Sequence, residues 1–239
     1  GYIDDVHGWD FANGNRSVYD SARNDRHGTH VAGTIAATAG NGRGIAGVAP
    51  YVRIMPLKFL SRQGGTTSDA IKAIRYARRN GADVINASFG GYFGGRALRD
   101  AIRASGLPLV AAAGNDGLNG DRYRVYPASY DLDNILSVTA VNNRGGLARF
   151  GNYGTRTVDV GAPGVDIFST VPGGYRYLSG TSMAAPLATG VAALVSQQRP
   201  KASGARIVRI VKRSAAPLDS LRGKTVTGGM VNAARAVAD

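Results

Sequence analysis

Apolar residues recur at helical spacing in parts of the chain and in short continuous runs in others. Between residues 68 and 79, the apolar positions Ala70, Ile71, Ile74 and Ala77 fall on one face of a helix, because positions three and four apart are neighbours there. Further helices are predicted at 97–104, 182–198 and 203–214. Buried strands are predicted at four short apolar runs: 52–60, 82–89, 107–113 and 135–141.

The order of these elements indicates the fold class. Strands and helices alternate along the chain, which favours a mostly parallel sheet covered by helices on both faces, a three-layer α/β fold. A length of 239 residues suits one such domain with a substantial core, and we find no internal repeat or low-complexity linker. Open sheets of this class bind ligands where strands end and helices begin.

Composition excludes several kinds of function. The chain has no cysteine, so thiol and disulfide chemistry are excluded, and it has no apolar run long enough to cross a membrane. The net charge is +13, and we interpret the basic residues as solvated helix faces. Attraction to nucleic acid or another anionic surface is the alternative, but no nucleic-acid-binding module supports it, so we expect neither nucleic acid nor membrane as a partner. The basic residues on predicted helices are Lys72, Arg75, Arg78, Arg79, Arg206, Arg209, Lys212 and Arg213.

A serine lies at the predicted start of the helix 182–198. The segment Gly180-Thr181-Ser182-Met183-Ala184-Ala185-Pro186 brings Ser182 close to unpaired backbone N–H groups and to the positive end of the helix dipole. That environment suits a nucleophile whose attack on a carbonyl creates an oxyanion. Pro186 is predicted to lie in the first helical turn, where its missing N–H costs nothing. The alternative for the segment by itself is an ordinary helix N-cap.

A histidine lies at the predicted start of another helix. His27-Gly28-Thr29-His30 precedes an apolar-periodic run that contains Val31 and Ile35, so we expect His27 to project from a helix start. The other two histidines, His7 and His30, are interpreted as surface or core residues.

The serine and histidine segments together resemble those of the subtilisin-like serine proteases, the subtilase family, in sequence and in order. The resemblance covers the whole chain and implies a subtilisin-like fold, secretion, a monomer, a propeptide and serine endopeptidase activity on polypeptides. It implies that Ser182 is the nucleophile and His27 the general base and acid. Ala111-Ala112-Ala113-Gly114-Asn115 resembles the family segment whose Asn donates to the oxyanion, which gives that role to Asn115.

The resemblance also implies where substrate binds. The segment 86–91, with Ser88, Phe89 and Gly90, resembles the strand that pairs with the substrate backbone, and Gln63-Gly64-Gly65 resembles the strand across the cleft. Gly90, Gly114 and the region 125–130 would outline the pocket for the residue before the cleaved bond. Asp116 is the only charge near that pocket, so we expect broad specificity, with apolar residues favoured and basic ones tolerated.

Residues 39–50 resemble a family loop that often binds calcium. Calcium takes about six to eight oxygen ligands, usually including carboxylates, whereas this loop offers the Asn41 side chain and backbone carbonyls and carries Arg43. A structural calcium ion is therefore the weaker interpretation and a plain glycine loop the stronger. The chemistry itself requires no cofactor.

Two departures from the family pattern stand out. The family's catalytic Asp precedes the His in a buried strand, before Ser or Thr and Gly, but no aspartate before His27 has that context. Asp5, Asp10 and Asp25 are weak substitutes. We therefore expect residues 1–239 to be a peptidase domain incomplete at its N-terminus, lacking the first strand and folding poorly by itself. A non-catalytic peptide-binding pseudoprotease is the alternative. The second departure is Leu187-Ala188-Thr189, where the family commonly has His-Val-Ala.

Overall fold

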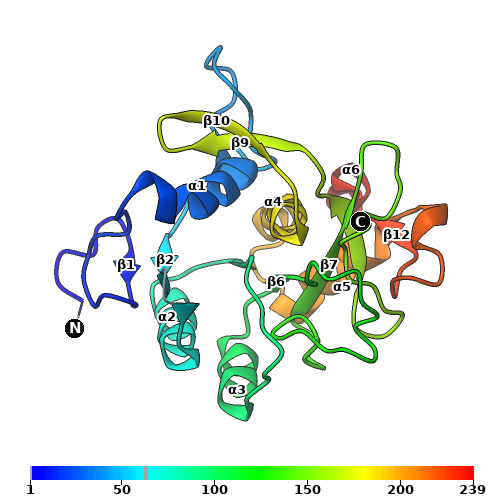
Figure 1. Ribbon diagram of the computed structural model, residues 1–239, viewed down its shortest axis with the longest axis horizontal. Coiled ribbons are helices and arrows are strands. Elements are labelled where there is room, and N and C mark those ends of the chain that lie inside the picture. The colour runs from blue at the N-terminus through cyan, green and yellow to red at the C-terminus, as the bar shows by residue number, and fades with distance from the viewer. Residues whose placement is uncertain (1, 62–63) are drawn as a thin grey trace.

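A six-stranded sheet forms the centre of the computed structural model, which describes residues 2–61 and 64–239 (Figure 1). Its strand order is β11-β12-β8-β7-β6-β5, and neighbouring strands from β12 to β5 are parallel while β11 is antiparallel to β12. The strands are β5 (Ile85–Ala87), β6 (Leu109–Ala112), β7 (Ile135–Val141), β8 (Val160–Pro163), β11 (Ala216–Pro217) and β12 (Gly229–Met230).

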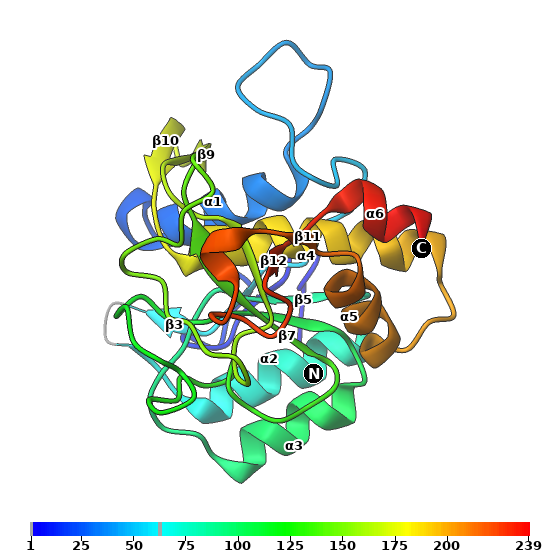
Figure 2. The same ribbon diagram turned by 90° about the vertical axis from the view of Figure 1, so that its right-hand side faces the viewer.

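Helices cover both faces of the sheet, which gives the three layers expected from the sequence. Helices α4 (Thr181–Gln198) and α5 (Gly204–Arg213) pack on one face, and α2 (Thr67–Arg79) and α3 (Arg96–Ser105) lie side by side on the other (Figure 2). Strand alternation explains the division. Val110 of β6 joins the α4–α5 cluster, whereas its neighbours Leu109 and Ala111 join the α2–α3 cluster.

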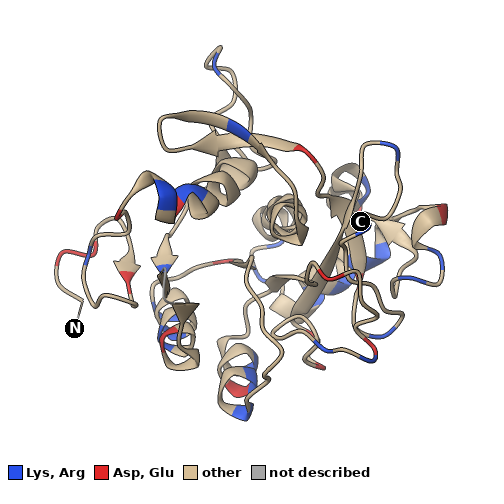
Figure 3. Ribbon diagram, in the orientation of Figure 1, with Lys and Arg blue, Asp and Glu red and all other residues tan. Residues whose placement is uncertain are grey.

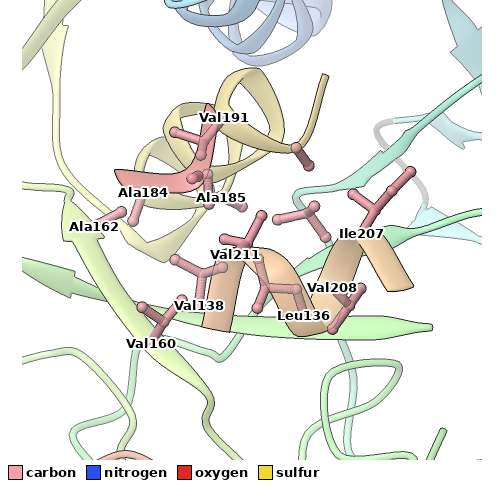
Figure 4. Packing of buried hydrophobic residues seen from close by; sticks show 14 of the residues in the cluster. Leu136, Val138, Val160, Ala162, Ala184, Ala185, Val191, Ile207, Val208 and Val211 are labelled. Atoms are coloured by element: carbon pink, nitrogen blue, oxygen red, sulfur yellow. The ribbon is translucent and has the colours of Figure 1, made fainter. Parts of the chain in front are cut away.

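The larger core cluster is built around α4 (Figure 4). Alanines and valines of α4 meet larger aliphatic side chains from the sheet and α5, and nearly all of them are fully buried. Burying such side chains contributes about 25 cal/mol per Å² of apolar surface removed from water, so this cluster is a main source of stability. Its labelled members are Leu136, Val138, Val160, Ala162, Ala184, Ala185, Val191, Ile207, Val208 and Val211.

Helix α1 (Ala22–Ala36) packs against α4 and against a hairpin of β9 (Ile167–Val171) and β10 (Gly174–Leu178). The approach to β9 is close at Gly33, where a Cβ would lie 2.0 Å from Thr170 Oγ1. The remaining elements are short: β1 (Trp9–Asp10) with β2 (Leu57–Lys58), β3 (Leu60–Ser61) with β4 (Gly64–Gly65), η1 (Asp219–Leu221) and α6 (Ala233–Ala238).

Most predicted elements are found with small differences in their ends. Strand β7 has the predicted bounds, and the four predicted helices start or end within one residue of expectation. The single strand predicted at 52–60 is wrong: only β2 and β3 form there, because Pro56 has no N–H for a ladder and residues 53–54 are exposed. Strands β5 and β6 are shorter than the apolar runs that contain them.

Lys and Arg lie on several helices, α2, α3 and α5 among them (Figure 3). The basic residues of α2 are exposed, as are Arg206, Arg209 and Arg213 of α5, in keeping with solvated helix faces. Lys212 is instead ion-paired with the buried Asp159. No helix in the described part of the chain is long and apolar enough to span a membrane.

Two glycines of α1 should respond to alanine in opposite ways. Gly33→Ala should lower the free energy of unfolding by about 1–3 kcal/mol, because the new methyl group would force α1 away from Thr170 and Ser169. Gly28→Ala should raise it by about 0.5–1 kcal/mol, because Gly28 lies within the helix with nothing inside 4 Å of its Cβ position. Urea unfolding of both variants checks the pair, and equal effects would contradict the packing of α1 on β9.

Candidate active site

Ser182 is the second residue of α4, whose N-cap is Gly180. The first helical N–H, that of Thr181, donates to Asn115 Oδ1 at 2.8 Å, and the Thr181 hydroxyl donates to the same oxygen at 3.0 Å. The N–H of Ser182 has no acceptor among the described residues. A helix start leaves such N–H groups free, so Ser182 carries both a hydroxyl and an open donor.

Pro186 does not lie in the first turn of α4, so that expectation is wrong. It is an interior residue of the helix, which begins at Thr181. An interior proline leaves the carbonyl four residues earlier without its partner, and here that carbonyl belongs to Ser182. The Ser88 hydroxyl donates to this carbonyl at 2.9 Å, which explains how the helix tolerates the proline.

Asn115 lies just beyond β6, and the oxygen and nitrogen of its side-chain amide have different tasks. Its Oδ1 accepts from Thr181, so its Nδ2 remains as a donor. A Cβ built on Gly180 would lie 3.8 Å from Asn115 Nδ2 and 3.7 Å from Ser182 N. The two donors therefore lie within 4 Å of the same point beside Gly180. This arrangement can stabilise the negative charge that develops on a carbonyl oxygen under attack.

A pocket of about 240 Å³ opens beside Ser182 and Asn115. It contains three of the predicted substrate-binding residues, Phe89, Gly90 and Gly114. Ser88 does not line it but contacts Ser182 directly, because the Ser182 hydroxyl donates to the Ser88 carbonyl at 3.3 Å. The complete lining is Phe89, Gly90, Gly91, Tyr92, Ala112, Gly114, Asn115, Asp116, Val125, Thr181 and Ser182.

Tyr92 is a pocket residue that the sequence did not reveal. Its hydroxyl is hydrogen-bonded to Asp116, which raises the pKa of the Tyr92 phenol above its ordinary value. A tyrosine in a glycine-rich loop has no distinguishing sequence signal, because its role depends on Asp116 from another segment.

The other predicted substrate strand is separate from this pocket. Gly64 and Gly65 form β4, an exposed strand that pairs antiparallel with β3, and neither lines the pocket. Gln63 lies outside the described residues. Substrate binding at Gly64 and Gly65 stays a prediction.

His27 lies in the second turn of α1 and not at the helix start, so that expectation is wrong. The helix begins at Ala22 because the Ser21 side chain accepts from Asn24 N, and Asp25 Oδ2 accepts from Ser21 N at 3.0 Å. His27 is exposed overall, but the protein packed around its ring disfavours the charged form and lowers its pKa, with a smaller contribution from His30.

Apolar packing and a buried histidine fix the helix that carries His27. Val31 and Ile35 of α1 pack with Met183, which follows Ser182 in α4. His30 is fully buried, and its Nε2 donates to the carbonyls of Ile167 at 2.9 Å and Arg176 at 3.1 Å. The helix of the histidine and the helix of the serine are thus held against each other.

Asp5, Asp10 and Asp25, the three possible substitutes for the catalytic acid, are hydrogen-bonded to other groups and not to His27. Asp5 accepts from the Tyr76 hydroxyl at 2.5 Å, and the buried Asp10 accepts from the N–H groups that follow it in a turn. Asp25 accepts from Lys58 Nζ at 2.8 Å. Although burial alone would raise the pKa of Asp25, the hydrogen bonds from Lys58 and the backbone lower it, so this carboxylate is ionised and paired. Across residues 2–61 and 64–239, no carboxylate is hydrogen-bonded to His27.

The loop 39–50 fits calcium poorly. Asn41 Oδ1 accepts from Arg43 N at 3.0 Å, so its side-chain oxygen is already engaged, and the loop has no carboxylate. No group of three or more potential metal-ligating His, Cys, Asp or Glu residues occurs in the described chain. Calcium binding is untested and stays a prediction.

A serine at a helix start thus lies beside an amide donor, and a histidine lies on a helix that packs against the helix of the serine. The family model described as Peptidase_S8, subtilase family, matches residues 1–234. This chain belongs to the subtilase family, as its sequence resemblance predicted.

Individual relatives agree with this assignment. The chain is 47% identical over 198 residues to a thermophilic serine proteinase of Bacillus sp. (strain AK1), covering 81% of this chain and 47% of that protein. It is 38% identical over 237 residues to thermitase of Thermoactinomyces vulgaris, covering 97% of this chain and 81% of thermitase. A solved protease structure from Pseudoalteromonas arctica PAMC 21717 matches with a TM-score of 0.80 at 37% identity, over 89% of this chain and 70% of that one. The predicted fold class is confirmed, and the chain spans about half the length of the Bacillus proteinase.

The pKa of His27 should lie below the ordinary value of 6.5. Its neutral ring then contributes stability that is complete above pH 6.5 and is lost as the pH falls through the folded pKa, because the unfolded state binds the proton more readily. Titration of the His27 ring signals by NMR checks this value. His27→Gln assigns the signals and should flatten the acid limb of the stability profile. A pKa at or above 6.5 would contradict the packing around the ring.

Proposed function

We propose that this chain is the peptidase domain of a serine endopeptidase that hydrolyses peptide bonds in polypeptides. The proposal rests above all on one observation: Ser182 lines a pocket together with Asn115, and the Ser182 N–H and Asn115 Nδ2, two donors without an acceptor among the described residues, lie near each other beside Gly180. A structural role would need neither the open N–H of Ser182 nor the uncommitted Asn115 Nδ2.

The chemistry assigns one task to each group. Ser182 Oγ attacks the peptide carbonyl while His27 takes its proton, and the oxyanion accepts hydrogen bonds from Ser182 N and Asn115 Nδ2. His27 then gives the proton to the leaving amine as the carbon–nitrogen bond breaks. Water, deprotonated by His27, hydrolyses the acyl-enzyme and restores the serine. The lowered pKa of His27 supports this cycle, because a base must be neutral at the working pH.

His27 needs an acid partner for full activity. An acceptor on the second ring nitrogen holds the tautomer and stabilises the imidazolium, and its loss in a serine protease costs about 10⁴-fold in kcat. None of the described carboxylates is hydrogen-bonded to or ion-paired with His27. This observation favours a second candidate function, a peptide-binding protein that keeps the cleft with little or no hydrolysis.

A fluorophosphonate probe separates the two candidates. It should label the 239-residue chain at Ser182, with Ser182→Ala abolishing the label and His27→Gln slowing it strongly, because only an activated serine reacts. Mass spectrometry of the labelled peptide identifies the residue. If the folded chain binds a peptide substrate but takes no label, the endopeptidase proposal fails for this chain and the binding function stands.

The pocket supports a broad specificity with one acidic position. Phe89, Ala112 and Val125 offer apolar walls, and Asp116 offers a carboxylate held by Tyr92. Peptides with an apolar residue before the cleaved bond should be preferred, and those with Lys or Arg should still be cleaved.

Asp116→Asn should lower kcat/KM for peptides with Lys or Arg before the cleaved bond by about fivefold, since a partly exposed ion pair contributes about 1 kcal/mol or less. Matched peptides with Leu or Phe at that position should change little and serve as the control. An equal loss for both peptide sets would show that Asp116 supports the pocket without reading charge.

Secretion, a monomeric state and a propeptide as folding partner also belong to the proposal, and family membership supports all three. Only the resemblance of loop 39–50 supports a structural calcium ion, which its side chains fit poorly.

A further inference from the structure

The structure assigns Ser88 a second role, as a positioning residue for the nucleophile: its hydroxyl supplies the hydrogen bond to the Ser182 carbonyl that Pro186 cannot give. This inference rests on the proposed function of Ser182 and goes beyond the substrate-binding role predicted for Ser88. The Ser88 hydroxyl lies 2.9 Å from the Ser182 carbonyl, and the Ser182 hydroxyl lies 3.3 Å from the Ser88 carbonyl. Two reciprocal bonds thus hold both ends of the nucleophilic residue.

The need for this contact arises inside α4. In a regular helix the N–H of residue 186 would bond to the carbonyl of residue 182, but proline has no N–H and its ring crowds that carbonyl. Pro186 and its neighbours Ala184 and Ala185 are buried, so water is largely kept from this turn. A carbonyl left unpaired there would cost free energy and would free the first turn to shift.

A chain of hydrogen bonds leads from the middle of α4 back to its start. The buried Thr189 hydroxyl donates to Asn86 Oδ1 at 2.8 Å and also lies 3.0 Å from the Ala185 carbonyl. Asn86 Nδ2 donates to Ser88 Oγ at 2.9 Å. Because Asn86 fills one acceptor site of the hydroxyl, the Ser88 proton is directed toward the Ser182 carbonyl.

Thr189 gives this chain of bonds its first member. Thr189 stands where the family commonly has Ala, and its hydroxyl gives Asn86 Oδ1 a hydrogen-bond partner that an alanine would lack. The altered triplet 187–189 is therefore linked to Ser88 through the Asn86 amide, whose Nδ2 donates to Ser88 Oγ.

The effect on catalysis follows from geometry. Ser182 must keep its hydroxyl aimed at substrate and its N–H aimed at the oxyanion, and a misplacement of about 1 Å slows an enzyme by about 10²-fold. The carbonyl of Ser182 belongs to the same residue as both groups. Anchoring it to β5 through Ser88 and Asn86 fixes their direction without contact to substrate.

Restoring an N–H at position 186 tests the inference. Ser88→Ala should slow fluorophosphonate labelling of Ser182 by about tenfold, as expected for one unmade hydrogen bond to a carbonyl in a poorly hydrated turn. In Pro186→Ala the new backbone N–H at position 186 can bond to the Ser182 carbonyl. Ser88→Ala should therefore cost about threefold or less in that background. Ser88→Thr, which keeps the hydroxyl, should label at nearly the wild-type rate, and Thr189→Val should slow labelling less than Ser88→Ala does.

Ser214→Ala is the matched control, since the buried Ser214 hydroxyl donates to the Val211 carbonyl at 3.1 Å at the end of α5. It should lower the Tm without changing the labelling rate, equally in the wild-type and Pro186→Ala backgrounds. The inference is overturned if Ser88→Ala slows labelling by the same factor in both backgrounds.

A double-mutant cycle measured by thermal unfolding separates this inference from the proposed function. It compares the wild type, Ser88→Ala, Pro186→Ala and the double variant. The drop in Tm caused by Ser88→Ala should shrink when Pro186→Ala is also present, whether or not the chain hydrolyses peptides. Wild-type protein that takes no label, with a coupled Tm cycle, refutes the endopeptidase and supports the contact. If the wild type is labelled but the two substitutions act independently on the Tm, the endopeptidase proposal is supported and the Ser88 contact is refuted.

Discussion

The burial of α4 between the sheet and α1 is the constraint on which the site depends. The helix packs against β5 to β8, against α5 and α6, and against the helix that carries His27. Its contact positions are small, and a Cβ at Gly190 would lie 2.5 Å from Val48 Cβ. Close packing of this kind fixes the axis of α4 and, with it, the place where the helix starts. Ser182, the proposed nucleophile, stands at that start.

The first turn of a buried helix has backbone N–H and carbonyl groups without helical partners, and residues of the site form hydrogen bonds with several of them. Free N–H groups and a carbonyl without a partner must be satisfied or put to use. Asn115 Oδ1 accepts from the Thr181 N–H, and the Ser88 hydroxyl donates to the Ser182 carbonyl. The Ser182 N–H has no acceptor among the described residues. The same contacts that satisfy the helix end therefore orient the groups to which the proposed acyl transfer is assigned.

The sequence predicts those features that depend on local pattern. Strand β7 and helix α2 follow from apolar periodicity within their own residues, and the serine and histidine segments identify the family. The hairpin of β9 and β10 was missed, although Pro172-Gly173 is a turn sequence between two strands.

The start of α1 follows from a capping signal that lies before the histidine segment: Ser21, six residues before His27, caps the helix together with Asp25. The place of Pro186 is not predictable from local rules, because the donor that makes it tolerable comes from Ser88, 94 residues before Ser182 in the sequence. Tyr92 is likewise recognisable only once Asp116 lies opposite it.

The aspartates near His27 in sequence have another task, which bears on how the base is activated. Lys58 is paired with Asp20 and Asp25 and lies 3.8 Å from Asp10, and its side chain is only 11% exposed. Removing one of these carboxylates would leave part of a largely buried charge without compensation, so none of them is free to turn toward His27. Asp20 and Asp25 thus hold the start of α1 to β2 through Lys58, and they are not available as the acid partner of His27. A carboxylate for His27 must come from a position that Lys58 does not neutralise, because an acid already paired with a lysine would stabilise the imidazolium much less.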